Sequence, residues 1–180
     1  MLDQALTLLH KKDSASICEG ARQLAKLGRP EGITPLLELL RTRDEAARAC
    51  VKDALAQLDV VPVLLADWRS GDDQTKDRAL DRAVALPHPG LMEIYHEAAT
   101  DPDAGRRRRV ATGLRHQAES AVTTKLLEAL VADADNDVRW WAIDTLGLST
   151  SPEAARILRA RLPHEPDAAL QVFIRRALGE

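Results

Sequence analysis

The stretch DNDVRWWAIDTLG, residues 135–147, decides the fold. Polar turn residues come first, a Val-Arg pair and apolar residues at helical spacing follow, and Leu-Gly ends the segment. Asp and Asn are preferred residues at the N-terminal cap of a helix, and Gly is preferred just after its C-terminus. The same order of features returns about every thirty residues along the chain. This periodicity predicts a stack of helix pairs in which each pair is covered by its neighbours.

Segments of this kind fill the whole chain between breaks rich in Pro, Gly and Asp. Each predicted pair consists of a first helix, a short turn and a second helix. The second helices are expected to begin near residues 14, 44, 73, 103, 135 and 167. A single pair would leave a leucine-rich face open to water, so neighbouring pairs must stack. We therefore predict an all-α fold, an α-α superhelix of about six antiparallel helix pairs, with residues 1–180 as a single domain.

The composition is that of a globular protein, with 45% hydrophobic and 29% charged residues. The formal net charge of −3 argues against a dedicated nucleic-acid coat. The most apolar stretch, residues 60–66, is interrupted by Pro62 and is far too short to span a bilayer. The N-terminal segment carries Asp3 within a short apolar run, which is unlike a signal peptide. We expect a cytoplasmic protein without membrane contact.

The two cysteines, Cys18 and Cys50, lie far apart and form no CxxC pair. They are predicted to be small buried apolar residues in a reducing compartment. The histidines His10, His88 and His116 are scattered and form no set of metal ligands. The sequence contains no glycine-rich phosphate loop and no recognisable Ser/His/Asp arrangement. We therefore expect no metal, no cofactor and no catalytic residues.

The chain resembles HEAT-repeat proteins, including the short-repeat kind seen in phycobilin lyases. Residues 137–139, with Ala142 and the Leu-Gly at 146–147, carry the resemblance. Segments similar to the C-terminal part of this motif occur at residues 25–28 and 177–179. The resemblance implies an armadillo-type superhelix whose second helices line the concave side.

The polar positions of the second helices are rich in arginine, most of all at residues 105–109. The planar guanidinium pairs with carboxylate or phosphate through two hydrogen bonds, which suits an acidic partner. The alternative interpretation is a solvated face that nearby aspartates neutralise. The candidate partner-binding residues are Arg78, Arg82, Arg106, Arg108, Arg109, Arg139, Trp140 and Asp144.

Two adjacent tryptophans stand out because the chain has only three. Helical spacing places Trp141 on the buried stripe with Val138, and Trp140 on the other side with Asp137 and Asp144. An exposed tryptophan beside arginines is a common composition of binding hot spots. Packing of Trp140 against the neighbouring repeat is the alternative.

The leading functional hypothesis is a non-enzymatic scaffold that binds a protein or acidic peptide through the arginine-bearing concave face. The alternative is a nucleic-acid-acting protein resembling HEAT-like alkylpurine DNA glycosylases, which use a tryptophan with a carboxylate. Trp140 and Asp144 have i,i+4 spacing on one helix. HEAT-like di-iron hydroxylases carry His-Glu pairs in successive second helices, but the pairs at 96–97 and 164–165 fall in a first helix and in a turn. Nothing marks the chromophore site of a lyase.

The last predicted helix has an apolar band wider than one stripe, because Val172 joins Leu170, Phe173 and Ile174. A terminal helix of a stack should be polar on its outer side. This excess predicts that the C-terminal helix docks onto a partner or a second copy of the chain, which would give a homodimer.

Overall fold

The computed structural model describes residues 1–86, 88–117 and 120–180. These residues form twelve α-helices and four short 3-10 helices, and contain no β-strand. The prediction of an all-α repeat fold is confirmed. The chain separates into two compact units, Met1–Leu86 and Pro87–Glu180, and each is described by itself. The prediction of a single domain stays a prediction.

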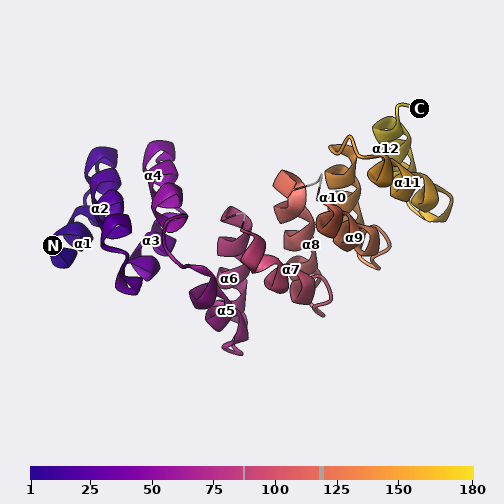
Figure 1. Cartoon of the computed structure of the whole chain (residues 1–180). Coiled ribbons are helices and arrows are strands. Elements are labelled where there is room, and N and C mark those ends of the chain that lie inside the picture. The colour runs from indigo at the N-terminus through magenta and orange to yellow at the C-terminus, as the bar shows by residue number, and fades with distance from the viewer. Residues whose placement is uncertain (87, 118–119) are drawn as a thin grey trace. The chain divides into compact units, whose positions relative to one another are not determined.

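The N-terminal unit consists of three successive helix pairs (Figure 1). Its helices are α1 (Leu2–Leu9), α2 (Ser14–Leu27), α3 (Ile33–Leu39), α4 (Glu45–Leu55), α5 (Val61–Arg69) and α6 (Asp73–Ala85), with the 3-10 helix η1 (Pro30–Gly32) before α3. Helix α2 packs on α1 within its own pair and on α4 of the next pair. The contact between α1 and α2 is close, since a Cβ added to Gly20 would lie 2.8 Å from the carbonyl oxygen of Ala5.

The C-terminal unit repeats this arrangement with three more pairs (Figure 1). Its helices are α7 (Met92–Ala98), α8 (Ala104–Gly113), α9 (Ala121–Leu130), α10 (Asn136–Gly147), α11 (Pro152–Arg161) and α12 (Ala168–Leu178), with 3-10 helices η2 (Pro89–Leu91), η3 (Leu114–Gln117) and η4 (Leu162–His164). The middle second helix, α10, packs on both α8 and α12. The second helices of this unit therefore lie side by side.

An aspartate caps every second helix. The six caps are Asp13, Asp44, Asp72, Asp103, Asp135 and Asp167. Each carboxylate accepts a hydrogen bond from a backbone N–H in the first turn of its helix, for example 2.8 Å from Ser16 N to Asp13 and 3.0 Å from Val138 N to Asp135. These bonds satisfy donors that no helical carbonyl can reach. The caps make the repeat visible in the sequence.

The observed second helices begin within one residue of the predicted positions, at Ser14, Glu45, Asp73, Ala104, Asn136 and Ala168. The first helices are shorter than predicted. Periodic apolar residues would allow the first two of them to continue to residues 12 and 42, but α1 ends at Leu9 and α3 at Leu39. Propensity alone does not mark these ends, because they are followed by short turns rather than by proline or a left-handed glycine.

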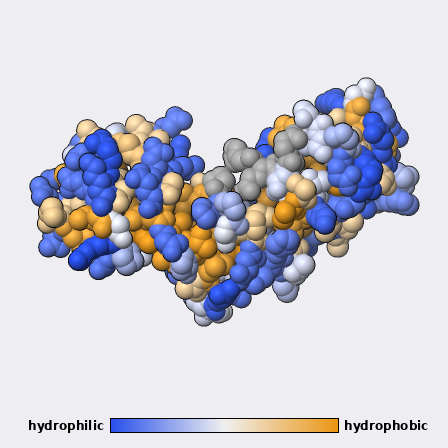
Figure 2. All heavy atoms as spheres, in the orientation of Figure 1, coloured by the Kyte–Doolittle hydropathy of each residue, from blue (hydrophilic) through white to orange (hydrophobic). Residues whose placement is uncertain are grey.

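Leucine, isoleucine, valine and alanine side chains fill the space between the helices. Leu24, Leu55, Leu64 and Leu80 are at most 1% exposed in the N-terminal unit. Ile94, Tyr95, Leu127, Ile143 and Ile174 are fully buried in the C-terminal unit. On the face shown in Figure 2, hydrophobic residues form a band among hydrophilic ones on the N-terminal unit. Each fully buried leucine contributes about 1.5–3 kcal/mol relative to exposure, so these contacts dominate the stability of the stack.

The caps predict a loss of stability in acid. Hydrogen bonds from backbone N–H groups lower the pKa of Asp13, Asp44 and Asp167 below 3.8, and the hydroxyl and N–H of Thr75 do the same for Asp72. A carboxyl whose pKa is lower in the folded state stabilises the fold at higher pH, and this contribution disappears as the pH falls through the lowered pKa. We expect the urea midpoint to fall between pH 5 and pH 2 as these groups protonate.

Asparagine supplies the control because it caps helices well without titrating. A variant with Asn in place of the caps at 13, 44, 72 and 167 should lose less stability over the same pH interval than the natural chain. An identical acid response of the two proteins would contradict this account.

Candidate functional site

Two of the predicted binding arginines lie in the N-terminal unit, on α6. Arg78 is exposed and donates to Thr75 Oγ1 at 3.0 Å. Arg82 is half-buried and forms an ion pair of 3.1 Å with Asp67 at the end of α5. Arg82 thus joins the two helices of its own pair, whereas Arg78 is accessible.

Arg106 and Arg139 are buried, with only 6% of each residue exposed. Arg106 pairs with Asp101 at 3.2 Å, and Arg139 pairs with Glu165 at 3.1 Å. The prediction that these two arginines face a partner is corrected here, because each side chain is buried and paired with an acid of its own chain.

Arg107 and Arg139 occupy equivalent positions, each four residues after an aspartate cap. Arg139 Nη1 donates to the carbonyl oxygens of Asp133 and Ala134, both at 3.0 Å. Arg107 Nη1 likewise donates to the carbonyls of Asp101 and Pro102, at 2.8 and 3.0 Å. Both therefore hold the turn between the first and second helices of their own pair. We call them the turn-linking arginines.

The other edge of each turn-linking guanidinium reaches the next pair. Arg107 donates through Nε and Nη2 to Asp133 at 2.7 and 2.9 Å. Arg139 donates through Nε and Nη2 to Glu165 at 3.1 Å. Each acid lies 26 residues after its arginine, in the following turn. Each arginine thus fixes the spacing of two adjacent repeats.

The turn-linking arginines and the acids that they bind stabilise one another's charged forms. Burial alone would raise the pKa of Glu165, but hydrogen bonds from Arg139, the Asp167 N–H and Arg161 outweigh it and lower that pKa. Burial acts in the same direction on Asp133, and hydrogen bonds from Arg107 and the Asp135 N–H again lower the pKa. The hydrogen bond with Asp133 raises the pKa of Arg107. Both carboxylates therefore stay ionised at neutral pH.

An aromatic cluster, Trp140, Trp141 and Phe173, lies on the second helices of the C-terminal unit. The rings of Trp140 and Phe173 are parallel within 1°, with centroids 5.5 Å apart, which joins α10 to α12. Trp141 meets Trp140 edge-on at 4.7 Å. Trp140 is 38% exposed, while Trp141 and Phe173 are half-buried. Trp140 is partly exposed and also packs against the neighbouring repeat, so both interpretations of it hold in part, and Trp141 is less buried than expected.

Arginines and aspartates surround the aromatic cluster. Arg108 on α8 pairs with Asp137 on α10 at 3.5 Å, and about half of the Arg108 side chain is exposed. Arg115 pairs with Asp144 at 2.5 Å and lies 6.0 Å from the Trp141 ring centroid. Arg109 is half-buried. Of the predicted residues, Arg108, Trp140 and Asp144 thus come together here.

A second feature of the described part of this unit is a pocket away from the predicted binding residues. An open pocket of about 320 Å³ lies on the first-helix side, between α9 and α11. Its acids Glu128 and Glu153 both pair with Arg156, at 2.8 and 2.7 Å, and no predicted binding residue lines it. Within the described parts of the chain, no three His, Cys, Asp or Glu side chains are placed to hold a metal ion.

The sequence matches known repeat families over both units. The family described as HEAT repeats matches residues 89–179. The chain belongs to the HEAT-repeat family. The PBS lyase HEAT-like repeat matches residues 18–42, which cover most of α2 and all of α3. No curated protein has a significantly similar sequence.

Solved structures support the fold. A designed armadillo repeat protein superposes with a TM-score of 0.50 at 13% identity, over 99% of both chains. An engineered protein gives a TM-score of 0.49 at 21% identity, over 99% of this chain and 95% of the other. The similarity to the designed armadillo repeat protein shows an armadillo-type fold and nothing about activity.

Loss of a turn-linking arginine should be costly. Arg139→Ala would leave Glu165 buried with Arg161 as its remaining ion-pair partner and would free two turn carbonyls. Breaking a buried ion pair from one side typically costs about 3–5 kcal/mol. Because Arg161 remains, we expect the lower end, about 3 kcal/mol, in urea unfolding followed by circular dichroism.

Arg159→Ala is the matched control, since Arg159 is exposed on α11 and should change stability by less than about 0.5 kcal/mol. Arg139→Lys should recover little, because an ammonium cannot reproduce the planar fork. Equal stabilities of the Arg139 and Arg159 variants would refute the structural role of Arg139.

Proposed function

We propose that this HEAT-repeat chain is a non-enzymatic scaffold that binds an acidic protein or peptide on the second helices of its C-terminal unit. The proposed contact surface consists of Trp140 with Phe173, together with Arg108, which pairs with Asp137 on the helix that carries Trp140. The observation that carries the proposal is the partly exposed Trp140 ring, held parallel to Phe173 across two repeats.

The distribution of aromatic residues supports this surface. The chain has five aromatic residues, three Trp, one Tyr and one Phe. Trp68 and Tyr95 are 3% and 0% exposed and belong to the core. The remaining three form the aromatic cluster outside the core. Tryptophan offers a large contact area at low entropic cost, and Trp and Arg are the residues most enriched in binding hot spots.

The charges around Trp140 favour an acidic partner. The pair of Arg108 with Asp137 is long, at 3.5 Å, and its two side chains are 48% and 71% exposed. Such exposed pairs contribute little to folding, so Arg108 can exchange Asp137 for a carboxylate of a partner at small cost. Arg106 and Arg139 are excluded from this surface by their burial.

The DNA glycosylase alternative has weaker support. It needs a free carboxylate beside a tryptophan that can stack on a nucleotide. Asp144 is instead held by Arg115 at 2.5 Å. One face of the Trp140 ring is covered by Phe173. We therefore keep nucleic acid as an outcome of the test rather than as the proposal.

Partner binding can be tested with two substitutions and two matched controls. Trp140→Ala and Arg108→Glu alter the proposed surface, whereas Val122→Ala and Arg159→Glu alter exposed residues on the first helices α9 and α11. The probe is a protein that the natural chain captures. We expect each surface variant to raise the dissociation constant for this protein by about 30-fold, as for a hot-spot residue. Titration calorimetry with the purified partner gives the constants, and thermal melts check folding.

The outcomes separate the hypotheses. Loss of binding in both surface variants, with the controls unchanged, supports the proposal. Salt-sensitive binding to duplex DNA that disappears in Arg108→Glu would favour the nucleic-acid alternative. Equal loss in the control variants would place the contact elsewhere.

We propose a second copy of the chain as the other candidate partner, through α12. Val172 is 55% exposed on this terminal helix, and its neighbours Ala168 and Ala169 are exposed as well. If this face self-associates, sedimentation velocity should show a dimer at high protein concentration, and Val172→Asp should return it to a monomer. A monomer at all concentrations of the natural chain rules out self-association.

The cytoplasmic location predicted from the sequence stays a prediction. No helix in the described residues is long and apolar enough to cross a membrane. The structure contains a disulfide, and disulfides persist mainly in oxidising compartments. The oxidation state of the cysteines inside cells would therefore test the location directly.

A further inference from the structure

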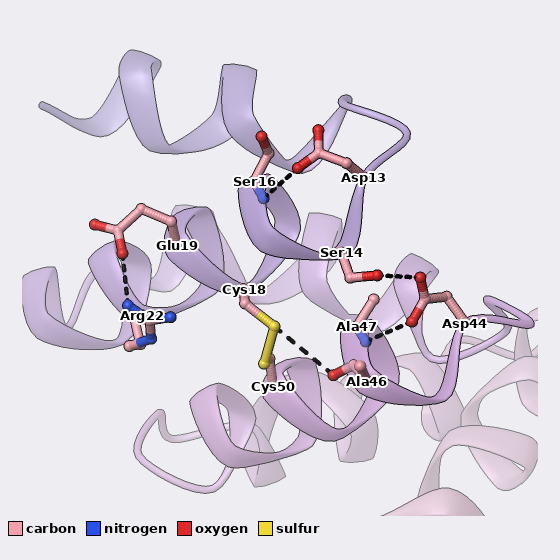
Figure 3. Close-up of a disulfide and its surroundings, with 10 residues drawn as sticks. All are labelled: Asp13, Ser14, Ser16, Cys18, Glu19, Arg22, Asp44, Ala46, Ala47 and Cys50. Carbon is pink, nitrogen blue, oxygen red and sulfur yellow. Dashed lines mark hydrogen bonds and ion pairs between the residues drawn. A yellow bond between two sulfur atoms is a disulfide. The ribbon is translucent and has the colours of Figure 1, made fainter.

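Cys18 on α2 and Cys50 on α4 form a disulfide, with their Cα atoms 5.1 Å apart (Figure 3). The prediction of two separate buried thiols is wrong. The two residues lie in adjacent second helices, five residues after the cap Asp13 and six after the cap Asp44. The fifth position after one cap and the sixth after the next face one another across the two packed helices, which is why sulfurs 32 residues apart in sequence meet.

The two sulfurs have different surroundings. Cys18 is 8% exposed, and its Sγ lies 3.7 Å from the carbonyl oxygen of Ala46. Cys50 is half-buried and so more accessible. After reduction, the Cys18 thiol could donate to the Ala46 oxygen, while Cys50 would face solvent. The site therefore accommodates both oxidation states without an unsatisfied buried group.

The disulfide adds a covalent bond to helices that already pack closely, since α2 and α4 form one of the most extensive helix contacts of the unit. Ser14 at the start of α2 donates to the cap Asp44, whose carboxylate also accepts from Ala47 N at 2.9 Å (Figure 3). Ile17, Ala21 and Val51 are buried in α2 and α4. The disulfide is the covalent part of a contact that hydrophobic burial and the Ser14–Asp44 hydrogen bond also stabilise. Closing a loop of 32 residues strongly restricts the unfolded chain.

We propose that Cys18–Cys50 is a thiol–disulfide exchange site, open to a dithiol reductant at Cys50, that controls how firmly the first two repeats are held together. A thiolate of the reductant attacks Cys50 Sγ, and the electron pair of the Cys18–Cys50 bond leaves on Cys18 Sγ, which takes up a proton. The second thiol of the reductant then attacks the mixed disulfide. Cys50 leaves as a thiolate and is protonated, and the reductant becomes the disulfide.

The C-terminal unit provides an internal control because both cysteines of the chain lie in the N-terminal unit. Hydrogen exchange read by mass spectrometry can therefore compare the two units in one sample. Dithiothreitol should accelerate exchange in α2 and α4 and leave α8, α10 and α12 unchanged. It should also lower the melting midpoint by roughly 10 °C.

In a double variant, Cys18→Ser with Cys50→Ser, the rate of hydrogen exchange should equal that of the reduced chain and should not change when dithiothreitol is added. If that variant fails to fold, reduction and reoxidation of the natural chain give the same comparison. The proposal is overturned if the protein purified in air has two thiols that iodoacetamide modifies without denaturant. It is equally overturned if reduction changes neither exchange nor melting.

The direction of attack is tested separately. The thiol of Cys50 in Cys18→Ser should react several-fold faster with an aromatic disulfide reagent than the thiol of Cys18 in Cys50→Ser, because exposure controls access. The opposite order would overturn the assignment of Cys50 as the attacked sulfur.

Discussion

No helix pair in this chain can bury its apolar face alone, and this constraint shapes the rest of the molecule. Second helices such as α10 touch their own first helix and the second helices on both sides. Stability then comes from contacts between neighbours, so the spacing of adjacent pairs must be kept accurate. Hydrophobic burial is not directional and cannot set that spacing by itself.

Directional hydrogen bonds from polar groups at the turns set the spacing of adjacent pairs. An aspartate fixes where each second helix begins, and in four of the six described second helices the side chain four residues later returns to the turn. Arg48, Arg107, Arg139 and Gln171 all donate to the carbonyl six residues before them, at 2.7 to 3.0 Å. In the C-terminal unit, Arg107 and Arg139 also reach an acid of the next turn. One residue thereby orders a turn and aligns two repeats.

This double role explains why the sequence predicted the fold better than the site. Caps and apolar spacing are local signals, so the starts of the second helices could be read almost to the residue. The arginines at these positions look like surface charges because their acceptors lie 26 residues away or on the backbone. Composition cannot separate Arg139, which is buried, from Arg108, which is not. Glu165, in a proline-bounded turn, gives no sign of burial until its equivalence to Asp133 is known.

Counting residues from the aspartate cap also relates the aromatic cluster to the disulfide. Trp140 stands five residues after Asp135 and Phe173 six after Asp167, as Cys18 and Cys50 do from Asp13 and Asp44. In both units these positions bring adjacent second helices into side-chain contact, by aromatic stacking in one and by a covalent bond in the other. In α4, α8, α10 and α12 the fourth position after the cap bonds to the turn, and the fifth and sixth positions face the neighbouring second helix. A repeat fold can therefore gain a binding surface or a redox-sensitive link by substituting only the fifth and sixth residues after the caps, which already meet across adjacent repeats.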